Sequence, residues 1–158
     1  MVSFTSYKIE NDVKFKNNLD KAVKAVGDLR FAMGEISRDI FKTTKQNFIL
    51  KGGGKYPALS DEYKKTKEKK KPNTPILVYS GALRDSVTGR GNEDTIRFIG
   101  KQSLVQGTRV PYSRYVQEGT SKMPERKYLF IDDAQSLRFA RIIEDFVASK
   151  MEVVGDVR

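Results

Sequence analysis

The stretch VPYSRYVQEGTSKMPERKYLFI, from Val110 to Ile131, decides the fold that the sequence predicts. Tyr112 and Tyr115 are three residues apart, a spacing typical of one short helical turn. Gly119 is expected to end that turn, because glycine readily takes the left-handed conformation. The apolar run from Tyr128 to Ile131 is typical of a buried strand. A helical turn, a glycine corner and a buried strand so close together in sequence indicate a surface of fixed shape. No residue pattern in this stretch points to catalysis.

The composition favours a chain whose core is incomplete by itself. Its 158 residues fit a single domain covering 1–158, yet only 38% are hydrophobic and 32% are charged. This balance favours an elongated protein, or one that neighbouring molecules complete. The net charge of +10 makes nucleic acid, an acidic protein surface and an anionic membrane the candidate partner classes.

The chain has no cysteine and no histidine. Disulfides, thiolate catalysis, most zinc sites and histidine acid–base chemistry are therefore excluded, and we expect no cofactor and no enzymatic activity. The beginning of the chain lacks the apolar core of a signal peptide, and no apolar run approaches the length of a membrane span. We therefore expect a protein made in a cytoplasm, without a membrane partner.

The first third of the chain predicts a long amphipathic helix. A short strand is expected over Val2–Ile9, followed by one continuous helix from about Asn17 to Asn47. Gly34 is its weak point, for which we expect a close packing contact rather than a hinge. The apolar stripe of the helix consists of Leu19, Ala22, Val23, Val26, Leu29, Met33, Ile36 and Ile40.

A glycine- and lysine-rich segment interrupts the domain. Lys51–Lys55 ends the helix but is not a phosphate loop, because a helix precedes it and Tyr56 stands where Ser or Thr is needed. Ser60 is a good N-cap for a short basic helix that Pro72 ends. We predict a flexible arm over residues 51–75, since its glycines lose much entropy on ordering and its lysines repel one another. These lysines are Lys64, Lys65, Lys67, Lys69, Lys70 and Lys71.

The remaining elements complete an α+β fold. Two strands are expected over Thr95–Ile99 and Leu104–Val110, the second interrupted at Gly107, with a last helix over Ala134–Met151. The predicted architecture is a long N-terminal amphipathic helix and a C-terminal helix packed on a small, mostly antiparallel sheet.

Three segments, in order, resemble the virion morphogenesis or tail-completion proteins of tailed bacteriophages, which are related to the neck rings that join head and tail. They are a glycine break followed by YPALS (56–60), an ILV run followed by SGALRDSV (80–87), and Tyr112, Tyr115, Glu118-Gly119-Thr120, Pro124, Arg126 and Leu129. The resemblance spans about residues 52–131. The aromatic residue before Pro57 is often Trp in such proteins, and Gln117-Glu118 stands where another pair is commoner.

The resemblance implies a structural virion protein at the junction of head and tail. It implies a closed ring, of six copies by analogy, whose partners are head-connector and tail proteins, with non-specific contact to packaged DNA as a further candidate. The residues expected at its assembly interface are Ser80, Gly81, Leu83, Ser86, Tyr112, Tyr115, Glu118, Gly119, Pro124, Arg126 and Leu129. For Arg126 we expect an interface contact or an ion pair that anchors a loop.

Two other functions stay open at this stage. A nucleic-acid-binding module would use the basic cluster Lys64–Lys71 on phosphates, with Tyr63 and Tyr79 stacking on bases. An enzyme would need carboxylates such as Glu118 or the pair Asp132-Asp133, but adjacent Asp residues before a helix are more often caps.

Overall fold

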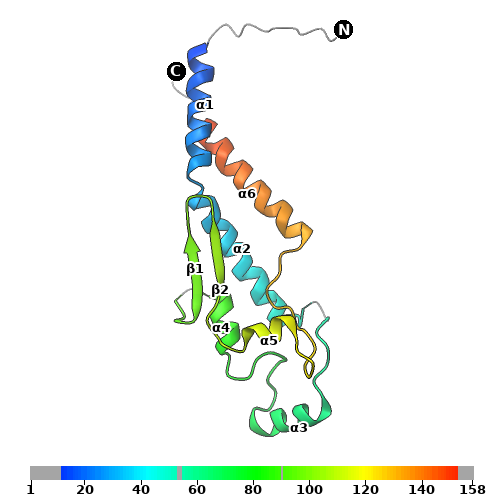
Figure 1. Cartoon of the computed structure of the whole chain (residues 1–158). Coiled ribbons are helices and arrows are strands. Elements are labelled where there is room, and N and C mark those ends of the chain that lie inside the picture. Colours follow the sequence, from blue (N-terminus) through cyan, green and yellow to red (C-terminus); the bar gives the residue numbers. More distant parts are fainter. Residues whose placement is uncertain (1–11, 53–54, 90, 153–158) are drawn as a thin grey trace, which may run out of the picture.

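The computed structural model describes residues 12–52, 55–89 and 91–152, and it confirms the α+β class. The strand predicted over Val2–Ile9 lies outside these residues. Figure 1 shows an elongated arrangement, with α1 and α6 side by side at one end and α3 at the other. The elements are α1 (Asp12–Gly27), α2 (Arg30–Ile49), α3 (Asp61–Lys70), α4 (Ala82–Thr88), β1 (Thr95–Ile99), β2 (Leu104–Thr108), α5 (Ser113–Glu118) and α6 (Asp133–Glu152).

The predicted long helix is broken in two, so its continuity was wrongly predicted. At the break, the backbone N–H of Leu29 donates to the carbonyl of Lys101 at 2.7 Å, and the Gln102 side chain donates to the carbonyl of Val26 at 3.0 Å. The Asp28 carboxylate accepts from the backbone and the guanidinium of Arg30. The tip of the β-hairpin and one aspartate therefore take over hydrogen-bonding groups that a continuous helix would pair internally.

The two halves of the predicted apolar stripe have different surroundings. In α2 the stripe is buried, from Leu29 through Ile36 to Ile40, whereas in α1 Val23 and Val26 remain 64% and 46% exposed. Gly34 lies inside α2, and a Cβ added there would meet nothing within 4 Å, so the close packing contact predicted for it is absent. Val23 and Val26 of the α1 half thus lie at the surface of the protomer.

Helix α6 packs along α1 and α2 rather than on the sheet (Figure 1). Phe146 stacks on Phe31 with ring centroids 5.8 Å apart, and Arg138 pairs with Asp39 of α2 at 3.2 Å. The predicted stripe residue Leu137 instead points outward and is 63% exposed. None of the described helices has both the length and the apolar character that a membrane crossing requires.

The two faces of the β-hairpin differ in their contacts and in their exposure to solvent. Its antiparallel ladder runs without interruption through Gly107, which pairs with Ile96, so the predicted break there is wrong. On the inner face Arg97 donates to the Ser37 hydroxyl of α2 at 2.8 Å, as part of a polar contact with the helix. On the outer face Phe98 and its cross-strand partner Val105 are 62% and 54% exposed. The hairpin therefore makes a polar contact with α2 through its inner face and leaves the apolar pair Phe98 and Val105 exposed on its outer face.

The predicted strand over Tyr128–Ile131 is irregular backbone, because side chains occupy its hydrogen-bonding groups. The Gln117 amide oxygen accepts from the backbone N–H groups of Tyr128 and Leu129, both at 3.2 Å, and its nitrogen donates to the Leu129 carbonyl at 2.6 Å. Asn47 donates to the Tyr128 carbonyl at 3.2 Å. The expected burial does hold for Tyr128, whose ring packs on Phe48 in the core. The core cluster consists of Phe48, Leu83, Val87, Val110 and Tyr128.

Candidate functional site

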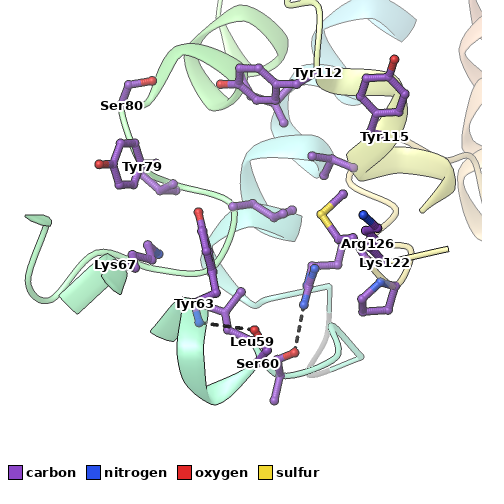
Figure 2. A pocket seen from close by; sticks show the side chains of 17 residues that line it. Leu59, Ser60, Tyr63, Lys67, Tyr79, Ser80, Tyr112, Tyr115, Lys122 and Arg126 are labelled. Atoms are coloured by element: carbon purple, nitrogen blue, oxygen red, sulfur yellow. Dashed lines mark hydrogen bonds between the residues drawn. The ribbon is translucent and has the colours of Figure 1, made fainter. Parts of the chain in front are cut away.

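The three segments that carry the sequence pattern meet around one half-open hollow of about 670 Å³. Figure 2 shows the rings of Tyr63, Tyr79, Tyr112 and Tyr115 around it, and we call it the tyrosine groove. Its lining consists of Ala58, Leu59, Ser60, Tyr63, Lys67, Leu77, Val78, Tyr79, Ser80, Leu83, Tyr112, Tyr115, Val116, Lys122, Met123, Pro124 and Arg126.

The first wall comes from α3 and the residues before it. Ser60 is the N-cap, as predicted, and its hydroxyl accepts from the Tyr63 N–H at 3.4 Å. Lys67 differs from the other lysines of the predicted flexible arm, because its side chain turns inward and is buried. Its Nζ donates to the carbonyls of Thr74 at 2.9 Å and Pro75 at 2.5 Å, and burial lowers its pKa. Lys67 thus closes the loop after α3 against the helix.

The second wall is the turn that enters α4. Gly81 has φ of +89° at the helix N-cap, a left-handed conformation that glycine adopts readily and that allows a tight entry into α4. Leu83 is 1% exposed and forms part of the floor of the tyrosine groove. Ser86 is also fully buried, where its hydroxyl lies 2.7 Å from that of Thr108 on β2. This hydrogen bond attaches α4 to the hairpin.

The third wall is α5 with the glycine corner that follows it. The predicted helical turn is confirmed as Ser113–Glu118, and Gly119 has φ of +75° and ψ of 179°, a conformation essentially reserved for glycine. A Cβ at Gly119 would lie 2.7 Å from the Glu125 nitrogen and 3.0 Å from the Met123 carbonyl oxygen. The lack of a side chain at Gly119 therefore allows the backbone at Gly119 and the backbone at Met123–Glu125 to approach closely.

Arg126 joins the first wall to the third. Its side chain is buried, with Nε donating to the Pro57 carbonyl at 3.1 Å and an Nη to the Ala58 carbonyl at 2.9 Å. Its own backbone N–H donates to the Val116 carbonyl at 2.8 Å. The loop anchor expected for Arg126 is present, but its partners are carbonyls instead of a carboxylate. Burial lowers its pKa.

The predicted interface residues divide into two groups. Ser80, Leu83, Tyr112, Tyr115, Pro124 and Arg126 line the tyrosine groove, whereas Gly81, Ser86, Glu118, Gly119 and Leu129 do not. Leu83, Ser86 and Arg126 are buried within the protomer, and their place at an assembly interface stays a prediction. Tyr112, the N-cap of α5, and Tyr115 within it are 45% and 58% exposed and are open to contact. Sequence reasoning missed Lys122 and Met123, which carry no distinctive spacing.

The segment predicted as a flexible arm has fixed contacts at several points. Arg126 and Lys67 hold its two ends, and the Tyr56 hydroxyl donates to the Lys127 carbonyl at 3.1 Å. Burial raises the pKa of Tyr56 to about 12. Mobility of residues 51–75 stays a prediction, which their rate of cleavage by trypsin would measure.

Glu118 and Asp132, two of the carboxylates considered for an enzyme, are engaged in structural contacts. Glu118 pairs with Arg114 one helical turn earlier at 2.9 Å. Asp132 caps α6, where its carboxylate accepts from the Gln135 N–H at 2.7 Å and the buried Gln135 amide accepts from the Asp132 N–H at 3.3 Å. This is a capping box, which the Asp-x-x-Gln spacing could have revealed. Over residues 12–52, 55–89 and 91–152, no group of acidic side chains is arranged to hold a metal ion.

We predict that Gly119→Ala destabilises the protein by about 1–3 kcal/mol, because alanine is strained in this backbone conformation and its Cβ meets backbone atoms. The matched control is Gly107→Ala, where an added Cβ meets nothing within 4 Å. The control should change the unfolding free energy by no more than about 0.5 kcal/mol. Urea unfolding of both variants measures the difference, and equal midpoints would contradict the strain at Gly119.

A second prediction concerns Arg126. Arg126→Ala should cost on the order of 2–4 kcal/mol, because it removes two hydrogen bonds from a buried charged donor. Arg114→Ala, at a side chain 78% exposed, is the control and should stay within about 0.5 kcal/mol of the parent. Thermal unfolding that did not distinguish the two variants would show that Arg126 is dispensable to the fold.

Comparison with known proteins identifies a family for the chain. The model of the phage virion morphogenesis family matches residues 10–148. No curated protein and no solved structure matches the chain.

Proposed function

The chain belongs to the phage virion morphogenesis family, and we propose that it is a structural component of the neck or of the tail-completion assembly. Membership of this family makes it a virion-associated protein that acts in phage assembly. In this proposal several copies close into a ring that joins tail to head, with head-connector and tail proteins above and below. The protein acts by binding its neighbours and not as an enzyme.

The observation that carries the proposal is the amount of apolar surface without cover. Exposed apolar side chains occur on α1, on the outer face of the hairpin and around the tyrosine groove, including Val23, Phe98 and Tyr115. A ring needs two different complementary surfaces on each copy, because its contacts are heterologous. The exposed apolar side chains on α1 and on the hairpin are candidates for these contacts between copies.

A second candidate function is contact with packaged DNA. Helix α3 and the residue after it expose Lys64, Lys65, Lys69, Lys70 and Lys71. Lys67, counted with them from the sequence, is occupied inside the protomer. The remaining lysines could still bind phosphates without sequence preference, and such binding would weaken steeply with salt.

The function is tested in the phage that encodes the chain. An amber mutation in its gene should yield filled heads and complete tails that stay unjoined, and particles from the parent should contain the protein in a fixed, multiple copy number. Electron microscopy and quantitative mass spectrometry provide these readouts. Normal joined particles from the amber mutant, or a single copy per particle, would contradict the proposal.

A further inference from the structure

The tyrosine groove combines aromatic walls with positive charge. Its lining contains three cationic side chains, Lys67, Lys122 and Arg126, and no Asp or Glu among the described residues that form it. The exposed lysines of α3 lie on the helix that forms its first wall. The lining itself therefore contributes positive and no negative side-chain charge, which favours carboxylates in a ligand.

The apolar part of the lining sets a second requirement. Leu83 forms a buried floor, and the rings of Tyr79, Tyr112 and Tyr115 are 44%, 45% and 58% exposed. Tyrosine offers an apolar ring face together with a polar tip, a combination that suits contact with side chains at a protein interface. The ligand should therefore carry apolar side chains for the floor as well as carboxylates for the rim.

The placement of the cations favours a peptide over a nucleic acid. Lys67 and Arg126 donate to carbonyl groups inside the protomer, so they contribute charge without reaching outward. Of the lining cations only Lys122 is exposed. Binding along a phosphate backbone needs several basic side chains that reach the phosphates directly. One such lysine above an apolar floor suits a carboxylate flanked by apolar residues.

We propose that the tyrosine groove binds an extended, acidic and apolar segment of a neighbouring virion protein. The proposal deepens the assembly function above and rests on it, because the segment belongs to a protein adjacent in the particle. Docking of extended peptides into aromatic-lined grooves is a recurring mode of recognition. Here the rings receive the apolar side chains, while Lys122 faces a carboxylate.

Purified protein and three synthetic peptides test the chemistry of the groove. The probes are repeats of Leu-Pro-Glu, of Leu-Pro-Lys and of Ser-Pro-Glu, in which proline keeps the chain extended. Fluorescence anisotropy should detect binding of the Leu-Pro-Glu peptide alone, and rising salt should weaken it. Binding of the lysine peptide, equal binding of the serine peptide, or no binding at all overturns the proposal, as does stronger binding of a single-stranded DNA oligonucleotide that competes for the groove.

Variants locate the binding on the protein. Tyr115→Ser should weaken the Leu-Pro-Glu peptide by about tenfold or more, as expected for an aromatic anchor, and Lys122→Gln should reduce both affinity and salt dependence. Phe98→Ser is the matched control, since it removes an exposed aromatic ring from the hairpin and should leave binding unchanged. Equal effects of Tyr115→Ser and Phe98→Ser would overturn the assignment to the groove. The peptide assay uses no phage particles, so a negative binding result tests only the tyrosine groove. Normal joined particles from the amber mutant would instead contradict the assembly function itself.

Discussion

The buried guanidinium of Arg126 is the interaction on which the shape of the tyrosine groove depends. It fixes the carbonyls of Pro57 and Ala58, while its backbone holds the end of α5 through Val116. A buried charge is costly unless its donors are paired, so the two carbonyls and the arginine require one another. Segments that are far apart in sequence thus form one groove, and Gly119 allows the close backbone approach that this arrangement needs.

The rest of the protomer leaves much of its apolar surface without cover. The hairpin packs its polar face on α2 through Arg97 and Ser37, and it turns Phe98 and Val105 towards solvent. The stripe of α1 is exposed at Val23 in the same way. Burial of apolar surface is the main favourable term in association as in folding, and these surfaces are what a partner would cover. A structural role in virion assembly explains this distribution better than activity as an isolated monomer.

Sequence periodicity predicted the elements whose partners are local. The hairpin strands, the turn at Tyr112–Val116 and the Ser60 cap follow from side-chain spacing and cap chemistry, which neighbouring residues decide. It failed where distant side chains satisfy the backbone. The Gln117 amide replaces a strand partner for Tyr128, and the hairpin tip interrupts the helix at Leu29. The inward turn of Lys67 was hidden for the same reason, since its carbonyl partners come from a loop whose path the sequence does not specify.

The order of three short segments was informative about the candidate site because they form one surface. Tyr112 and Tyr115 were predicted at that surface, but the supporting positions of Leu83 and Arg126 required the structure. Hydroxyl-radical footprinting, comparing free protein with protein in assembled particles, tests the account most directly. Tyr79, Tyr112 and Tyr115 should react in the free protein and be protected in the particle. Equal reactivity of these tyrosines in both states would contradict the assignment of the tyrosine groove as an assembly surface.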